Sequence, residues 1–351
     1  MLTPLNLSVS VVIPVYNGGK SFRRCLSALK KALPLPHEVI VVADGDTDGS
    51  RQVAEEFGAL VIKLPQAGGP ARARNLGAKA ATGDILFFID ADVEMNPDAI
   101  AQVATFFEHH PNISALIGSY DDAPGASNFL SQYKNLFHHY THQTAKENAS
   151  TFWGACGAIR RNVFLSLGGF DENYRLPCVE DIELGYRLKA AGYKIRLCKD
   201  IQVKHLKHWS PISLLKAEFF YRALPWTALI LRSHSLNNDL NLQTSHRLSA
   251  VLTYIFICAL ISAWWLPGLA AIAATIAIVL FTLNLEVYHF FLKKRGLLFA
   301  AQTIPWHWFY YFYSALAFAI GFIRHSYNEL KTKRIFFFSF LRQNHTQYLS
   351  R

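Results

Sequence analysis

Two aspartates separated by one residue are the first feature of this sequence with a clear chemical use. Asp90 and Asp92 flank Ala91 and directly follow the apolar run Ile85–Ile89. Two carboxylates at this spacing can face one hard cation, and Mg²⁺ or Mn²⁺ prefers such oxygen ligands. A cation held there could bridge two phosphates and stabilise charge that develops on a departing diphosphate. Asp90 and Asp92 are therefore candidate metal ligands.

Four further residues could take part in the same chemistry. Asp44, at the end of a second apolar run, suits recognition of a base or ribose. The pair Glu180 and Asp181 begins a helical pattern, where a carboxylate could act as general base for a hydroxyl or only favour the helix dipole. His205 follows the predicted strand Ile201–Lys204 and is either a further metal ligand or a surface histidine near a membrane.

The elements that must position these residues alternate in type along the chain. Strands are predicted at Val9–Val15, Glu38–Ala43, Ala59–Leu64 and Ile85–Ile89, with helices at Ser21–Lys31, near Ser50–Phe57 and at Pro70–Ala81. Short, continuous apolar runs are typical of parallel strands buried on both faces. The alternation predicts an α/β fold with a Rossmann-like, doubly wound, mostly parallel sheet.

In such a sheet, ligands bind beyond the carboxyl ends of the strands. The polar residues that follow the predicted strands are Asn17, Asp44, Asp46, Asp48, Asp90 and Asp92. We therefore expect the acidic residues to converge on one edge of the sheet, although single aspartates at such positions are also ordinary turn residues.

The composition changes towards the C-terminus. Of the 351 residues, 51% are hydrophobic and 17% are charged, whereas charged residues make up about 25% of a typical soluble domain. Residues 248–285 contain no Asp, Glu, Lys, Arg or His. A membrane span needs about 20 apolar residues, so this stretch predicts two helices that meet near Trp264–Gly268. The alternative is a buried helical hairpin of a soluble protein. A third apolar segment comprises residues 297–323. The number of membrane spans, two or three, therefore stays open.

These patterns divide the chain into four parts. Residues 1–211 are the predicted catalytic domain, and residues 212–247 an amphipathic connector that either lies at a membrane interface or packs on that domain. Residues 248–323 form an all-α membrane region, and residues 324–351 a basic tail. An acceptor pocket is expected between Phe129–Trp153 and the connector.

The net charge of +10 suggests an anionic membrane surface or phosphorylated substrates. Nucleic acid is not expected, because the sequence has no zinc-finger spacing and no basic recognition helix. The positive-inside bias places Lys293–Arg295 in the cytoplasm beside the N-terminal domain. Five cysteines without a CxxC pair fit a reducing compartment. We therefore expect a multi-pass protein of the cell membrane with a cytoplasmic catalytic domain.

Several motifs between about Ser8 and Trp226 occur together in a characteristic order. They are Val11–Asn17, Val42–Ser50, Ala73–Gly77, Gly83–Asp92, Gly168–Glu172 and Glu180–Leu184. As a set they resemble the inverting family 2 glycosyltransferases with the GT-A fold. The sequence departs from the usual pattern at Ala43, which replaces the first aspartate of a pair, and at Asp46, which replaces a serine.

The resemblance implies roles for individual residues. Asp181, or else Glu180, would be the general base, and Asp90, Asp92 and His205 would hold Mg²⁺ or Mn²⁺. The nucleotide-sugar site would comprise Pro14, Tyr16, Asn17, Asp44, Asp46, Arg74, Asp90 and Ala91. The processive synthases of the family carry a glutamine/arginine-x-x-arginine-tryptophan motif. Tyr221–Trp226 does not reproduce its spacing, so a single addition is expected.

The expected function is transfer of one sugar, with inversion, from a nucleotide diphosphate sugar to a lipid-linked or membrane-proximal acceptor. A UDP-sugar is favoured as donor. The alternatives are a non-catalytic membrane component that binds nucleotide sugars, and a sugar nucleotidyltransferase. The identity of the sugar and of the acceptor, and the oligomeric state, stay open.

Overall fold

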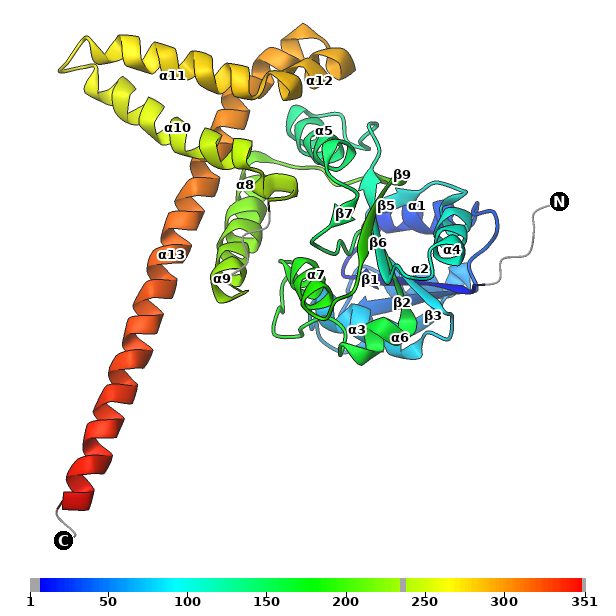
Figure 1. Cartoon of the computed structure of the whole chain (residues 1–351). Coiled ribbons are helices and arrows are strands. Elements are labelled where there is room, and N and C mark those ends of the chain that lie inside the picture. The colour runs from blue at the N-terminus through cyan, green and yellow to red at the C-terminus, as the bar shows by residue number, and fades with distance from the viewer. Residues whose placement is uncertain (1–6, 234–237, 349–351) are drawn as a thin grey trace.

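A computed structural model of the chain describes residues 7–233 and 238–348. Its N-terminal part is built on one sheet with helices on both faces (Figure 1). The strands are β1 (Val9–Val15), β2 (Glu38–Asp44), β3 (Leu60–Leu64), β4 (Ile85–Ile89), β5 (Val93–Met95), β6 (Ala115–Tyr120), β7 (Asn148–Ala149), β8 (Cys156–Arg160) and β9 (Ile195–His205). The helices of this part are α1 (Gly19–Leu29), α2 (Ser50–Phe57), α3 (Pro70–Ala80), α4 (Ala99–His109), α5 (Phe129–Thr144), α6 (Arg161–Ser166) and α7 (Glu180–Ala190).

The strand order is β3-β2-β1-β4-β8-β6-β9-β5, with β7 paired to β9. From β3 to β4 all pairings are parallel, which confirms the α/β fold and the four predicted strands. Beyond β4 the sheet is mixed, because β8 runs antiparallel to both β4 and β6. The five residues of β4 are all buried, as expected for a strand with a layer of helices on each side.

The close fit of α3 on the sheet depends on Gly77. A Cβ at this position would lie 2.4 Å from Cγ1 of Val12 on β1, which is closer than packed atoms tolerate. Pro70 stands at the first turn of α3, where its missing N–H is harmless. The sequence thus places α3, with Arg74 on it, tightly against β1 and β2.

Helix α5 lies between the sheet and the C-terminal helices. On one side, ring nitrogens of His139 and His142 contact the carbonyl oxygens of Tyr120 and Gly118 on β6, at 2.7 and 2.8 Å. On the other side, its apolar residues join a cluster with residues of the C-terminal helices. The cluster contains Tyr133, Leu136, Phe137, Val287, Phe291 and Ala300. Helix α5 therefore couples the two parts of the molecule.

The connector is helical and packs on the catalytic domain. It comprises α8 (Pro211–Lys216), the π-helix η1 (Ala217–Ala223) and α9 (Leu224–Ser233). Trp226 is buried against Val179 and Tyr186 of the α7 region, and its indole N–H donates to the Tyr186 hydroxyl at 3.2 Å. Ile212 and Phe220 instead are 80% and 58% exposed. The alternative of packing on the domain is therefore confirmed, and an exposed apolar face remains.

Residues 248–285 form two antiparallel helices, as predicted. The remaining helices are η2 (Leu240–Leu242), α10 (Thr244–Ser262), α11 (Leu269–Leu283), α12 (Leu285–Arg295) and α13 (Leu297–Tyr348). Helices α10 and α11 lie side by side (Figure 1), and the turn between them carries Trp264, which is 86% exposed. Within the described residues, α10 is the one helix long and apolar enough to cross a membrane by itself. Helices α11 and α12 are long and apolar enough only when taken together, as a pair bent by 62°.

Helix α13 contains the third apolar segment but extends beyond it. It runs from Leu297 to Tyr348 without a break, so the boundary drawn at residue 324 falls inside a helix. Next to its start, the basic cluster Lys293–Arg295 contacts the catalytic domain. Lys294 pairs with Asp122, and the Arg295 guanidinium donates to the Asp122 carbonyl oxygen at 2.9 Å. The prediction that this cluster lies beside the N-terminal domain is confirmed.

Candidate active site

The register of the sheet brings His205 to the aspartates that follow β4. Strand β5 pairs antiparallel with β9, and Val93 lies opposite His205. The backbone N–H of Leu206 also donates to the Asp92 carbonyl oxygen at 2.8 Å. As a result, Nε2 of His205 lies 3.6 Å from Oδ2 of Asp92, although 113 residues separate the two in the sequence. Burial acts to raise the pKa of Asp92, but the facing His205 and Lys207 outweigh it and lower the pKa.

The imidazole of His205 is held by two neighbours that the sequence analysis did not identify. Its Nδ1 lies 2.7 Å from Oδ1 of the buried Asn135 on α5, and its ring stacks on Tyr120 with the centroids 4.5 Å apart. A histidine whose Nδ1–H donates to such a partner presents its Nε2 lone pair to a metal. The contact with Asn135 thus directs Nε2 towards Asp92.

The geometry of Asp92 and His205 fits a divalent cation that keeps open positions. Asp90 makes a different contact from that of Asp92. Its Oδ1 accepts a hydrogen bond from the Arg74 guanidinium at 2.7 Å. Among the described residues there is no group of three or more His, Cys, Asp or Glu placed to hold a metal ion. A cation bound by Asp92 and His205 would need further oxygen ligands from phosphates or water, as is usual for Mg²⁺.

Arg74 forms ion pairs with two acids at this edge of the sheet. Its side chain is buried between two acids, donating to Asp90 at 2.7 Å and to Glu180 at 2.8 Å. A Cβ at Gly154 would lie 2.9 Å from the Arg74 Cζ, so the backbone at Gly154 approaches the guanidinium closely. Arg74 therefore connects the end of β4 with the start of α7.

Of the two acids at the start of α7, Asp181 is the one whose side chain lines a cavity. The Glu180 carboxylate is occupied by Arg74 and by the backbone N–H of Cys178 at 2.9 Å. Asp181 accepts from the backbone N–H of Gly154 at 3.0 Å and lines a cavity. Burial, and then the adjacent Glu180, raise the pKa of Asp181 to about 6. A base with this pKa accepts a proton readily near neutral pH.

The residues after β1 and β2 form the rest of the predicted nucleotide site. Asp44 is 4% exposed, and its two carboxylate oxygens accept from the backbone N–H groups of Gly68 and Gly69 at 2.7 and 2.9 Å. In this structure Asp44 therefore fixes the loop that leads into α3. Its contact with a base stays a prediction.

The neighbouring loop is held by similar bonds. Asn17 has a left-handed backbone with φ of 50°, and its Oδ1 accepts from the Thr47 N–H at 2.8 Å. Asp46 accepts from the Arg51 N–H at 3.0 Å. Tyr16 is 61% exposed at the end of β1, where its ring is free to stack. Pro14, also in β1, and Ala91, between the two aspartates, are both partly buried.

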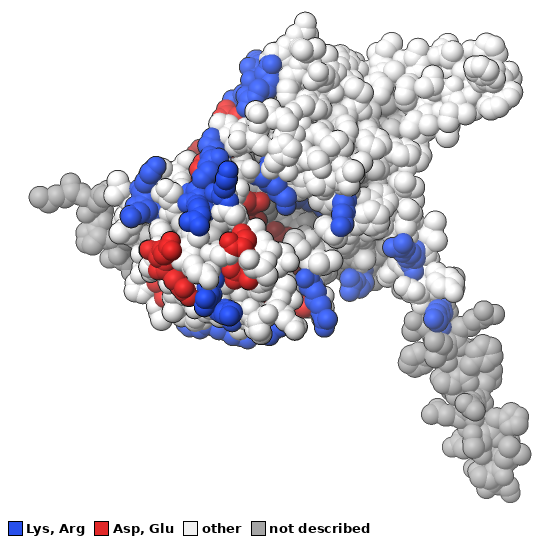
Figure 2. Space-filling view, turned by 180° about the vertical axis from the view of Figure 1, so that it is seen from behind, with Lys and Arg blue, Asp and Glu red and all other residues white. Residues whose placement is uncertain are grey.

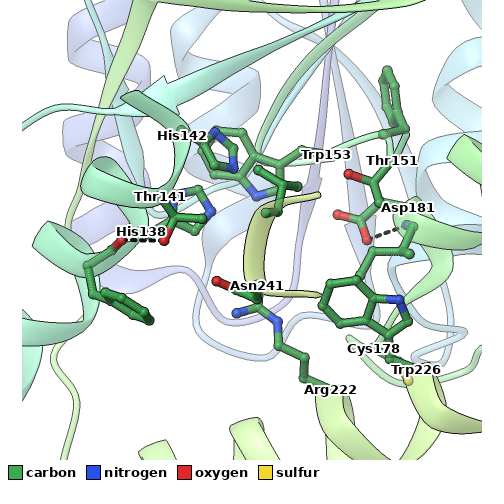
Figure 3. Close-up of a pocket in the computed structure, with 14 residues that line it drawn as sticks. His138, Thr141, His142, Thr151, Trp153, Cys178, Asp181, Arg222, Trp226 and Asn241 are labelled. Atoms are coloured by element: carbon green, nitrogen blue, oxygen red, sulfur yellow. Dashed lines mark hydrogen bonds between the residues drawn. The ribbon is translucent and has the colours of Figure 1, made fainter. Parts of the chain in front are cut away.

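A cavity lies beside Asp181, between α5, α7 and the connector (Figure 3). His138 and His142 of α5 line one side, and Trp226 and Arg222 come from the connector. These are the two regions expected to build an acceptor pocket. The sequence analysis did not identify His138, His142 or Arg222 individually, because no motif surrounds them.

The charged residues are distributed unevenly over the surface. In the face shown by Figure 2, Lys, Arg, Asp and Glu gather over the catalytic domain, and the hairpin of α10 and α11 is almost free of them. Large exposed apolar residues lie on this hairpin, among them Val251, Ile255, Trp264 and Ile278. The hairpin therefore presents an apolar surface beside a charged domain.

Comparisons with known proteins identify the domain. The family model described as Glycosyl transferase family 2 matches residues 10–168, and a model described as N-terminal domain of galactosyltransferase matches residues 134–209. The chain is 27% identical over 240 residues to the O-antigen chain rhamnosyltransferase RfbN of Salmonella typhimurium, covering 63% of this chain and 74% of the relative. It is 34% identical over 115 residues to the poly(ribitol-phosphate) β-N-acetylglucosaminyltransferase TarS of Staphylococcus aureus, covering 30% of this chain and 20% of the relative.

A solved structure of TarS residues 1–349 with UDP-GlcNAc aligns with a TM-score of 0.48 and 23% identity, covering 65% of this chain and 66% of that chain. The family match covers the strand ends that carry Asn17, Asp44, Asp90 and Asp92, and the second match covers β9 with His205. Residues 10–168 therefore match a glycosyltransferase family 2 domain.

Proposed function

We propose that the protein transfers a single sugar, with inversion, from a nucleotide diphosphate sugar to a hydroxyl of a lipid-linked or membrane-proximal acceptor. The observation that carries the proposal is the placement of Asp181. This carboxylate lines a cavity and has a pKa raised to about 6. The adjacent Glu180 pairs with Arg74, which also pairs with Asp90.

The donor would bind at the carboxyl ends of β1, β2 and β4. Tyr16, exposed at the end of β1, offers its ring to a base, and Asp92 with His205 would hold Mg²⁺ or Mn²⁺ at the diphosphate. A cation bound there supplies charge stabilisation for the departing nucleoside diphosphate. A UDP-sugar is the favoured donor.

The acceptor hydroxyl would enter the cavity beside Asp181. Its proton passes to the Asp181 carboxylate while its oxygen forms a bond to the anomeric carbon of the donor sugar. The bond from that carbon to the diphosphate oxygen breaks on the opposite face, which inverts the configuration. Holding both reactants in line supplies much of the acceleration.

The helical region would attach the enzyme to the cell membrane. Helix α10 is long and apolar enough to cross a bilayer, and α11 with α12 forms a bent pair. Lys294 and Arg295 contact the catalytic domain, and the positive-inside bias favours a cytoplasmic position for both. The names of RfbN and TarS refer to an O-antigen chain and to poly(ribitol-phosphate). A glycan of the cell envelope is therefore the proposed acceptor class.

A thermal-shift screen of nucleotide sugars with Mn²⁺ tests the donor proposal. A ligand that binds only the folded state raises the unfolding temperature, so the true donor should give the largest stabilisation. Replacing Asp92 by Ala should remove this stabilisation. A screen in which no nucleotide sugar stabilises the wild-type protein, or in which the Asp92→Ala variant responds equally, would contradict the proposed donor site. Pyrophosphate release would instead identify a nucleotidyltransferase.

A further inference from the structure

The cavity beside Asp181 contains buried polar atoms without partners. Nδ1 of His138 and Oδ1 of Asn241 are buried and make no hydrogen bond within the described residues, and both side chains line the cavity (Figure 3). Leaving such groups unsatisfied destabilises the folded state. A ligand with hydroxyl groups would satisfy them.

His142 adds a hydrogen-bond acceptor to the same wall. Burial lowers its pKa to about 4, so the ring is neutral at physiological pH. Its Nδ1 lies 2.8 Å from the Gly118 carbonyl oxygen, to which a nitrogen must donate, and Nε2 is therefore unprotonated. With the rings of Trp153 and Trp226 also lining the cavity, the site has both the hydrogen-bonding groups and the flat apolar surfaces that a sugar ring needs.

Arg222 gives the cavity a positive charge, which its ion-pair partner Glu218 balances only in part. The guanidinium lies 3.4 Å from Oε1 of Glu218, but the same oxygen already pairs with the Lys134 ammonium at 2.7 Å. One carboxylate thus faces two cations. Burial, together with the charge of Arg222, contributes to lowering the Lys134 pKa to about 8.

The backbone around Arg222 is also unusual. Glu218 and Arg222 both lie in η1, a π-helix, and such segments are frequent at functional sites. Of the residues that line the cavity, the acidic one is Asp181, and this carboxylate becomes neutral when it accepts a proton. During transfer the positive charge of Arg222 is therefore left with its share of the Glu218 carboxylate.

Building on the proposed function, we propose that this cavity binds the terminal sugar of the acceptor and that Arg222 binds an anionic group, a phosphate or a carboxylate, carried by that acceptor. The planar guanidinium suits either group because two of its N–H donors match two oxygens. The anion could come from a phosphate that links the sugar to a carrier or from an acidic sugar, and the experiment separates these sources.

Matched soluble probes test the proposal in the full-length protein. Methyl glucoside is neutral, methyl glucuronide carries a carboxylate, and glucose 1-phosphate carries a phosphate. These probes and their galacto and manno counterparts are titrated calorimetrically with UDP and Mn²⁺ present in excess to fill the donor side. We expect at least one anionic probe to bind about tenfold more tightly than its neutral counterpart, as a charge-assisted hydrogen bond would give.

Variants assign that preference to Arg222. The Arg222→Gln variant should bind anionic and neutral probes about equally, and Arg222→Lys should keep part of the preference because it keeps the charge. Arg232→Gln, on the exposed part of the same connector, is the matched control and should behave as wild type. Unfolding temperatures of all variants show whether each is folded.

The outcomes separate this proposal from the proposed function. Wild-type protein that binds no anionic probe more tightly than the neutral one, or an Arg222→Gln variant that keeps the preference, would overturn the anion site. If no nucleotide bound, this result would contradict the proposed donor site. The comparison of anionic and neutral probes could still be made without nucleotide.

Discussion

Asp181 is held at the start of α7 by a backbone N–H of Gly154, and its pKa is raised to about 6. A general base acts in its ionised form, so kcat/KM should be constant above pH 7 and fall about tenfold for each unit below pH 6. The measurement is a pH profile of sugar transfer with the donor identified by the thermal-shift screen. A profile that stays flat down to pH 5 would exclude Asp181 as the base.

Replacing the same residue provides the control for this profile. The Asp181→Asn variant should lose about 10²–10⁴-fold in transfer rate and the acidic limb of the profile with it. Glu183→Gln changes an acid on the same helix that pairs with Arg187, and it should retain both the rate and the profile.

Arg74 supports the site through two acids at once. In an Arg74→Met variant Glu180 would remain buried without its partner, and breaking a buried ion pair in this way costs about 3–5 kcal/mol. Because the Asp90 side chain is 34% exposed, we expect a loss of about 3 kcal/mol in the free energy of unfolding, measured by denaturant titration in detergent. Arg51→Met removes a surface pair with Glu55 and should change stability by less than about 1 kcal/mol. Equal stability of the two variants would contradict a central role for Arg74.

Helix α7 can carry Asp181 to the cavity only because it approaches the preceding loop closely. A Cβ at Gly185 would lie 2.2 Å from the backbone nitrogen of Phe152 and 2.5 Å from the Thr151 Cα. Backbone atoms cannot move aside as a flexible side chain can, so Gly185→Ala should push α7 away from the loop.

We expect the Gly185→Ala variant to lose about 1–3 kcal/mol of stability, as is usual for overpacking, together with most of its transfer activity. Gly268→Ala is a matched control in the turn between α10 and α11, where an added Cβ would meet nothing within 4 Å. Thermal unfolding and transfer rates of both variants are compared with wild type, and a fully active, stable Gly185→Ala variant would contradict the close approach.

At the level of helices and strands, the sequence predicts the parallel half of the sheet well. The strands β1 to β4 are continuous apolar runs, and their ends carry the polar residues of the site, so local patterns are sufficient there. Strands β5 and β7 have only three and two residues. Their pairing depends on the long strand β9. The sequence predicts only its part Ile201–Lys204, and no local pattern reveals which strands pair with it.

The candidate site is likewise only partly predictable from local sequence patterns. Asp90, Asp92 and Asp181 stand in recognisable motifs. His205 lies beside Asp92, and its role as a metal ligand stays a prediction. Contacts such as Arg74 with Glu180, or Asn135 with His205, join residues far apart in the chain and require the folded structure. The ion-pair environment of Arg222 likewise depends on how η1 packs against α5.

For the whole molecule, a chain of buried hydrogen bonds joins the catalytic domain to the helical region. The Tyr133 hydroxyl on α5 contacts Nδ1 of His307 at 2.9 Å, and Nε2 of His307 contacts the Tyr311 hydroxyl at 3.0 Å. Tyr311 in turn donates to Oδ1 of Asn284 at 2.6 Å. Since α5 also forms a wall of the cavity, the helical region holds the cavity in place as well as providing an apolar surface.

Membrane attachment should therefore depend on the exposed face of α10. Val251 is 58% exposed on this helix, and an aspartate near the centre of a membrane helix costs about 2.5–3.5 kcal/mol. We expect Val251→Asp to lower partition into phospholipid vesicles by about 10²-fold, measured by flotation. Leu60→Asp, at an exposed position of β3 in the catalytic domain, introduces the same charge far from the hairpin and should float as wild type does. If Val251→Asp and wild type floated equally, the α10 face would not be the membrane contact. Loss of flotation in both variants would show that the added charge, rather than its position, was responsible.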